Sequence, residues 1–514
     1  MLNKVANLGG MFAQKSDHPL ANARELKRVV SELPRDNAFK ALDEMSGWLE
    51  SLEGVSGFPG ANLLEVLEQF EEAAQPHLKR LSKDYFGSTR LSKSEENRLW
   101  SINAVFWARL AAGYERCLDS VADKPRPGEV AKTALPALCV RLIVALARSL
   151  KWQQFHYGPS PDGCWLSLGR ALLAAEAAGV AGKAVSLPGL GGMTTALQEY
   201  QKAMIFQAAS LDSLLPVGIE LAEHLIAHFL PGFVFSTEAH EDSVYWVDLK
   251  LAQPPLRLAR MPAFAEPTQR FLKPGASHAA MQSLLETLER GGDMPPDIKL
   301  GGQYSVKWLI AVLRHLTNYL SPMPPQRLHD RHRVMHRMSV LNGLVNAFVV
   351  YSDEFRGKPA GLPMESWVAE NVSRGGFGAL VGAVPGEWLK VGALVAMQPE
   401  GGENWLLGVV RRFHRTSDAD ARVGIQALAT KVSAIEFRIR GASSYAAAAG
   451  TPALLLLDGN EANEFRVVLP PMTFDLREGL EYVRDKQRYL LTPIAQVEQN
   501  ADFELARYRQ TRLG

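Results

Sequence analysis

The chain has 514 residues, of which 56 are basic and 55 acidic, so its formal net charge at pH 7 is +1. This length predicts roughly two to four domains. The balanced charge excludes a strong general attraction to nucleic acid or to an anionic membrane, because such binding depends on an excess of basic residues. Any anion-binding site must therefore be local, and nucleic acid is not expected as a partner.

The three cysteines, Cys117, Cys139 and Cys164, are far apart and lack CxxC spacing. This pattern argues against a disulfide framework or a thiolate zinc site and favours buried, reduced thiols.

Residues 1–19 contain no apolar segment typical of a secretory signal. The most apolar helical stretch, residues 134–150, is interrupted by Arg141 and Arg148, so no membrane span is expected. We therefore expect a soluble, cytoplasmic protein.

Residues 1–232 are predicted to form a mostly helical domain. Leu63, Val66, Leu67 and Phe70 recur at i, i+3, i+4 and i+7, with glutamates between them. This spacing is typical of an amphipathic helix that buries one face.

The pattern changes near residue 233. Residues 233–236 and 244–249 are rich in aromatic and β-branched side chains, which favours strands. Two helices are predicted near residues 279–290 and 305–320. Residues 233–320 are therefore predicted to be a mixed α/β continuation of the N-terminal region.

A proline-rich segment, residues 321–325, marks a domain boundary, because proline cannot continue a helix. Residues 321–337 are predicted to be a linker rich in proline and arginine. Residues 338–440 contain short strand-like segments between glycine-rich turns, which favours a small barrel. The predicted strands are 338–350, 367–372, 377–381, 393–398, 405–412 and 423–428.

Residues 441–514 are predicted to form a small C-terminal β extension. Its strands are expected at 453–457, 464–469 and 487–491. Residues 497–509 are expected to form a closing helix or strand. The predicted fold class is a multidomain α + β protein, in which a mostly helical N-terminal region precedes a six-stranded β-barrel and a small C-terminal β unit.

Two short motifs suggest a local anion site. Arg333 and Arg337 form RxxxR, and Asn371, Ser373 and Gly376 form NxSxxG before an apolar strand. An arginine fork matches phosphate oxygens and the O6/N7 edge of guanine. An amide and a hydroxyl on alternate strand residues share one face, where they can read a base, and glycine allows close approach of a ligand.

These motifs, in this order, resemble the PilZ domain family of bacterial receptors for cyclic di-GMP. The resemblance covers residues 327–435, about a fifth of the chain, and includes strand patterns at 391–395, 408–412 and 423–428. The spacing from Arg337 to Asn371 is wider than is usual for the family. Residues 351–365 are expected to form a loop that absorbs the excess, which costs little entropy.

The resemblance implies that the chain is a signal receptor rather than an enzyme, with cyclic di-GMP as its ligand and no cofactor. It implies that Arg333 and Arg337 hold the phosphates and the guanine Hoogsteen edges. It also implies that Asn371 and Ser373 hydrogen-bond a guanine while Gly376 leaves room for it. Three further residues of the predicted linker are expected to add charge: Arg327, Arg331 and His332.

On this interpretation the barrel senses the nucleotide and the helical region contacts an unidentified protein partner. Because the arginines follow the proline-rich segment, a ligand held there could fix the orientation of the two domains. The downstream process is left open. One alternative is an interaction scaffold whose PilZ-like barrel binds no nucleotide.

A second alternative is a metalloprotein. His224 and His228 lie at i and i+4 of a predicted helix, a spacing that can chelate a metal. A third ligand would come from residues 240–242, of sequence HED. The segment is not HExxH, however, and lacks a general base at the required position, so no metal is expected.

Overall fold

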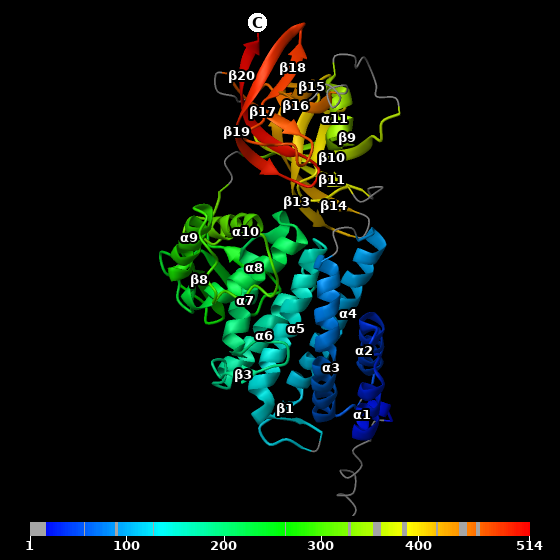
Figure 1. Ribbon diagram of the computed structural model, residues 1–514. Helices are drawn as coiled ribbons and strands as arrows, with labels where there is room; N and C mark the ends of the chain where they lie inside the picture. The colour runs from blue at the N-terminus through cyan, green and yellow to red at the C-terminus, as the bar shows by residue number, and fades with distance from the viewer. Residues whose placement is uncertain are drawn as a thin grey trace, which may run out of the picture. The chain divides into compact units, whose positions relative to one another are not determined.

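The computed structural model (Figure 1) divides into two compact units, Met1–Pro325 and Gln326–Gly514. The structure describes residues 17–513, with these exceptions: 56, 88–90, 127, 263, 327–329, 353–360, 383–387, 418–419, 442–449 and 459–462.

The first unit is mainly helical, and its long helices α3, α4 and α5 pack side by side (Figure 1). The predicted apolar stripe on α3 is confirmed, since Leu63, Val66, Leu67 and Phe70 are all buried. The helices of this unit are α1 (Ala23–Glu32), α2 (Ala38–Glu53), α3 (Gly60–Gly87), α4 (Lys93–Asp119), α5 (Leu135–Phe155), α6 (Cys164–Ala177), α7 (Ala196–Ala208), α8 (Pro216–Phe229), α9 (Gly275–Glu289) and α10 (Val306–Tyr319).

A four-stranded antiparallel sheet lies between α8 and α9 in the sequence, with strand order β5-β8-β6-β7. The two predicted strands near residue 233 correspond to β5 and β6, and the two predicted helices that follow correspond to α9 and α10. The strands are β5 (Val234–Ser236), β6 (Tyr245–Asp248), β7 (Leu256–Arg257) and β8 (Gln269–Lys273). Two short pairs complete the unit, β1 (Val121–Ala122) with β2 (Val130–Ala131) and β3 (Val185–Ser186) with β4 (Met193–Thr194).

The helical segment Lys132–Phe155, which contains α5, is long and apolar enough to cross a membrane by length and composition. This differs from the expectation that no segment would reach that length. In the structure, 72% of its apolar window is buried against the rest of the protein. Packing within the unit therefore accounts for its apolar character, as it does for the core helix of a globular domain.

The second unit contains two closed six-stranded antiparallel barrels, which confirms the predicted fold class. The first barrel comprises β9 (His332–Asn342), β10 (Glu365–Ser373), β11 (Gly376–Val381), β12 (Leu394–Pro399), β13 (Leu406–Arg415) and β14 (Ala421–Ala429). The second comprises β15 (Val432–Ile439), β16 (Thr451–Leu456), β17 (Glu464–Leu469), β18 (Leu480–Arg484), β19 (Gln487–Gln499) and β20 (Glu504–Leu513). The C-terminal β unit is thus a full barrel, and β15 and β18 were not predicted.

The two barrels have the same topology. Around the first barrel the strands follow the order β9-β10-β11-β14-β13-β12, and around the second they follow β15-β16-β17-β20-β19-β18. Counted from the first strand of each barrel, both orders are 1-2-3-6-5-4. The second unit is therefore a tandem of two barrels with one strand arrangement.

The predicted strand 338–350 is wrong in its second half. Strand β9 ends at Asn342, and α11 (Gly343–Tyr351) follows. Gly343 has φ of +77°, which ends the strand. The buried residues of α11, Leu344, Ala347 and Val350, recur every three residues as on a helix face. A short apolar run does not by itself distinguish strand from helix, which explains the error.

Two other boundaries differ from the predictions. Strand β9 begins at His332, so Arg333 and Arg337 lie on the first strand of the barrel and not in the preceding linker. Most of the predicted loop 351–365 lies outside the described residues, and α11 occupies part of the wide spacing between the two motifs.

The two barrels share one hydrophobic core, to which α11 contributes. This core joins Leu341 and Leu407 of the first barrel to Leu454 and Leu505 of the second. Ion pairs also link the barrels, among them Lys390 with Asp502 at 3.2 Å. Because the core is continuous, the two barrels are expected to unfold together.

Gly169 on α6 packs closely against the backbone at Leu249, and this contact can be tested by substitution. A Cβ at this position would lie 1.9 Å from the carbonyl oxygen of Leu249. We therefore expect Gly169→Ala to lower the free energy of unfolding by about 1–3 kcal/mol, because α6 would have to shift away from the backbone at Leu249. Denaturant unfolding followed by far-UV circular dichroism measures the change.

The matched control is Gly47→Ala on α2, where an added Cβ would meet no atom within 4 Å. This exposed helical glycine should gain about 0.5–1 kcal/mol on substitution by alanine. Equal effects of the two substitutions would contradict the packing of α6 described above.

Candidate functional site

A surface pocket of about 660 Å³ lies where β9, β10 and β14 come together in the first barrel. Its volume falls within the range of roughly 300–1,000 Å³ that small-molecule sites occupy. Its lining residues are Arg331, Arg333, Val334, Met335, Glu370, Asn371 and Arg422.

The pairing of β9 with β10 brings the two sequence motifs together. Arg333 lies directly opposite Asn371, although the two are far apart in the sequence. Residues directly opposite in an antiparallel pair have adjacent side chains on one face of the sheet. The register therefore places a guanidinium beside an amide at the edge of this pocket.

A β-bulge in β9 interrupts this register. His336 pairs with Ala369 and Arg333 with Asn371, so two residues of β9, Val334 and Met335, lie opposite Glu370 alone. A bulge increases the local twist of a strand pair. Val334, Met335 and Glu370 all line the pocket.

The two motif arginines differ in their relation to the pocket. Arg337 pairs with Val368, whereas Arg333 pairs with Asn371. The register of β10 with β11 also shifts at Glu370, so Val368 pairs with Leu380 and Asn371 with Gly378. Of the two arginines, only Arg333 lines the pocket.

Two polar groups of the pocket have no partner among the described residues. With the described residues, the exposed guanidinium of Arg333 makes no hydrogen bond or ion pair. The Oδ1 atom of Asn371 is buried, and no hydrogen-bond donor of the described chain reaches it. Leaving a buried acceptor unpaired costs about 1–3 kcal/mol, and such groups recur at functional sites.

Ser373 and Gly376 close the turn between β10 and β11. The Ser373 hydroxyl donates to the Gly376 carbonyl oxygen at 3.2 Å. A Cβ on Gly376 would lie 2.0 Å from the carbonyl oxygen of Ile425 on β14. In this structure both residues hold the end of β10 against its neighbouring strands, and neither lines the pocket.

The remaining predicted site residues, those of the predicted linker, also differ in whether they line the pocket. Arg331 lines the pocket, whereas His332 pairs with Val372 at the start of β9 and is not part of the lining. Arg327 lies outside the described residues.

Sequence reasoning missed an ion pair within the pocket. Arg422 of β14 donates from Nε and Nη2 to the two carboxylate oxygens of Glu370 at 3.0 and 3.3 Å. Glu370 directly precedes the NxSxxG motif, and Arg422 lies in a segment identified only as a strand. No local signal joins them, because their proximity depends on the strand order β10-β11-β14.

Part of the helical unit is similar to a known protein family. Residues 24–240 match the family described as cyclic-di-GMP receptor FimW, N-terminal domain. This match covers α1 to β5 and the loop that follows, and it does not include the barrel motifs. No curated protein matches the chain.

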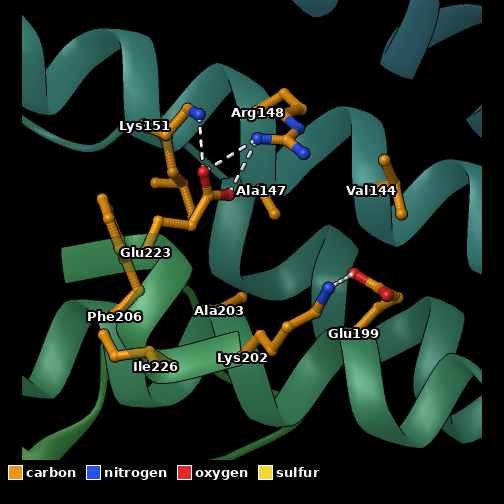
Figure 2. Close-up of a pocket in the computed structure, with 11 residues that line it drawn as sticks. Val144, Ala147, Arg148, Lys151, Glu199, Lys202, Ala203, Phe206, Glu223 and Ile226 are labelled. Carbon is orange, nitrogen blue, oxygen red and sulfur yellow. Dashed lines mark hydrogen bonds and ion pairs between the residues drawn. The ribbon is translucent and has the colours of Figure 1, made fainter. Parts of the chain in front are cut away.

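Within the matched region, a second pocket lies between α5, α7 and α8 (Figure 2). Figure 2 shows Arg148 and Lys151 directed at Glu223, with Oε–N distances of 2.8 and 2.6 Å, and Lys202 paired with Glu199 at 2.7 Å. Its volume is about 30 Å³, close to that of one water molecule.

The charges around this second pocket are matched. The three cations Arg148, Lys151 and Lys202 face three carboxylates, because Glu220 also pairs with Lys151, at 2.8 Å. A neutral cavity of this size does not suit a nucleotide. It acts instead as a polar junction that joins three helices.

The histidine pair proposed as a metal site lies next to this junction. The Nε2 atom of His224 is 3.4 Å from Oε1 of Glu220, and the Nε2 atom of His228 is 3.9 Å from Oδ2 of a different residue, Asp297. The described residues contain no group of three or more histidine, cysteine, aspartate or glutamate side chains able to hold a metal ion. The metalloprotein alternative thus has no complete ligand set within the described ranges.

The junction predicts acid sensitivity of the helical unit. Burial alone would raise the pKa of Glu220, but Lys151 and a hydrogen bond with His224 outweigh burial and lower the pKa from 4.5 to about 2. For Glu223, burial is likewise outweighed by Arg148 and Lys151, which lower its pKa well below the usual range. A carboxylate with a lowered folded-state pKa stabilises the fold above its unfolded-state pKa.

We therefore expect the stabilisation by both carboxylates to be complete above pH 4.5 and to fall as the pH decreases from there toward 2. Glu223→Gln should weaken the junction at neutral pH by about 1–3 kcal/mol, because Arg148 and Lys151 lose a charged acceptor. Hydrogen exchange of the α5 and α8 amides localises the effect.

The matched control is Glu286→Gln on α9. The ion pair of Glu286 with Arg290 is exposed, with 62% and 79% of the two side chains accessible to solvent. Its loss should change stability by less than about 1 kcal/mol. Similar protection of α5 and α8 in both variants at neutral pH would contradict a stabilising junction.

Proposed function

We propose that this chain is a cytoplasmic receptor for cyclic di-GMP, and not an enzyme, with the nucleotide bound in the pocket of the first barrel. The observation that carries the proposal is the cross-strand pair of Arg333 with Asn371, which unites the RxxxR and NxSxxG motifs at one pocket. The match of residues 24–240 to the N-terminal domain of a cyclic-di-GMP receptor supports the same ligand from a separate part of the chain.

The charge of the pocket complements this ligand. Its lining contains three arginines, Arg331, Arg333 and Arg422, and one carboxylate, Glu370, which sum to a formal charge of +2. Cyclic di-GMP carries two phosphodiester groups and hence two negative charges. Opposite charge held in a concave site favours binding and speeds association.

The chemistry of the lining fits the parts of the nucleotide. The free guanidinium of Arg333 can donate two parallel hydrogen bonds to a phosphate or to the Hoogsteen edge of guanine. The unpaired Oδ1 atom of Asn371 accepts a hydrogen bond, and guanine offers donors at N1 and N2. Binding would thus satisfy a group that the free protein leaves unpaired.

The same proposal gives the helical unit the role of the responding module, which contacts a protein partner. Two of the pocket arginines, Arg331 and Arg333, lie close in sequence to Pro325, the last residue of the helical unit. A ligand held by Arg331 and Arg333 would restrain the connecting segment. It would shift the arrangement of the two units only by its difference in affinity for the alternative arrangements.

Calorimetric titration of the full chain with cyclic di-GMP tests the site. We expect Arg333→Ala to weaken binding by about 10- to 100-fold, because a charge-assisted hydrogen bond contributes roughly 1.5–3 kcal/mol. Arg337→Ala should weaken binding less, since Arg337 does not line the pocket.

Arg438→Ala is the control, because Arg438 is an exposed arginine on β15 of the second barrel and loses the same charge. Equal affinities of the Arg333 and Arg438 variants would refute the site. A wild-type chain that binds no cyclic di-GMP would instead favour the alternative of an interaction scaffold with a non-binding barrel.

A further inference from the structure

We infer that Arg422 binds the nucleotide together with Arg331 and Arg333. We also infer that Glu370 regulates the site, because its carboxylate competes with the ligand phosphate for Arg422. This inference rests on the proposed function. It assigns roles to two residues outside both sequence motifs and predicts that the wild-type affinity is held below its maximum.

The geometry of the pair is that of a phosphate contact. Arg422 uses Nε and Nη2 to reach both oxygens of Glu370, at 3.0 and 3.3 Å. The same fork of donors binds two oxygens of a phosphate. In the free protein, the carboxylate of Glu370 therefore occupies the position on Arg422 that a phosphodiester oxygen pair would take.

The two residues meet across an intervening strand. Val368 pairs with Leu380 of β11, and Leu380 pairs with Arg422 of β14. Glu370 lies two residues beyond Val368, where the register with β11 shifts, and its carboxylate reaches the guanidinium of Arg422. The ion pair therefore spans β11, and both of its members join Arg333 in the lining of the pocket.

The pair is weak enough to open. Solvent reaches 58% of the Arg422 side chain and 28% of the Glu370 side chain. Ion pairs with this exposure contribute little to stability. A doubly charged ligand can therefore displace Glu370 from Arg422, but the displaced carboxylate then faces a like-charged phosphate, which lowers the affinity.

A second arginine–carboxylate pair that involves the same barrel, Arg411 with Glu498, lies away from the pocket. Arg411 of β13 also holds a carboxylate, Glu498, through both of its oxygens, but it donates as well to Gln426 at 2.7 Å. The Arg411 pair joins the first barrel to β19 of the second, away from the lining of the pocket. Its role is structural, whereas the Glu370 pair faces the ligand.

The test is a set of calorimetric titrations of full-length protein with cyclic di-GMP, using Glu370→Gln, Arg422→Gln and the double variant. We expect Glu370→Gln to bind about 3- to 10-fold more tightly, because the competing charge is removed. Arg422→Gln should bind about 10-fold more weakly. The gain from Glu370→Gln should be at least threefold larger when Arg422 is present, since competition requires both residues.

The control is Glu481→Gln in the second barrel. The Glu481 side chain is 26% accessible and pairs with Arg440 and Arg488, so it matches Glu370 in exposure and charge. It should leave the affinity unchanged. Thermal unfolding of each variant confirms that the fold is retained.

Three outcomes would overturn the inference while leaving the proposed function intact. An unchanged affinity of Arg422→Gln would show that Arg422 does not contact the ligand. Equal gains from Glu370→Gln with and without Arg422 would indicate general repulsion without competition. A loss of affinity in Glu370→Gln would mean that Glu370 accepts hydrogen bonds from the guanine. Absence of binding by the wild type would overturn the proposed function, and the inference with it.

Discussion

The pairing of β9 with β10 determines which side chains meet at the pocket. It sets Arg333 directly opposite Asn371, although the two residues belong to motifs far apart in the sequence. The register shift between these strands sets Val334 and Met335 against Glu370, whose carboxylate is bound by Arg422. Arg337 instead pairs with Val368 and does not line the pocket. The register of one strand pair thus brings one motif arginine, the motif asparagine and the Glu370–Arg422 pair to one place.

The tandem barrels explain why a single pocket of this kind is proposed. The second barrel repeats the strand order of the first, so its turn between β16 and β17 corresponds to the NxSxxG turn between β10 and β11. At that turn, Asp458 accepts hydrogen bonds from the backbone amides of Thr430 and Lys431, in the segment that joins the two barrels. Glu464, at the start of β17, pairs with Arg507 and Arg509. At the equivalent end of the second barrel, the described carboxylates are therefore engaged by the chain's own amides and arginines, and Asp458 connects the two barrels.

The sequence was sufficient to predict features that depend on local pattern. The apolar stripe of α3, most strands of the first barrel and the position of Asn371 at a strand end follow from periodicity and glycine placement. The helix α11 was missed because its apolar residues are compatible with a strand until Gly343 is seen to break the backbone. The Glu370–Arg422 pair could not be predicted at all. It depends on a register across three strands, and a one-residue change in register moves every side chain to the other face.

The distribution of charge shows why the barrel pocket, and not the helical junction, is suited to an anion. In the helical unit, Arg141 is paired with the buried Glu71, and the cations of the α5, α7 and α8 junction are matched by an equal number of carboxylates. These pairs leave no net charge for a ligand, and removal of a partner would leave a buried charge unsatisfied. In the barrel pocket, the single carboxylate of the lining, Glu370, is held by Arg422 in a pair exposed enough to exchange. Full compensation makes the helical charges structural, whereas Arg333, which no described residue engages, is available to an anion.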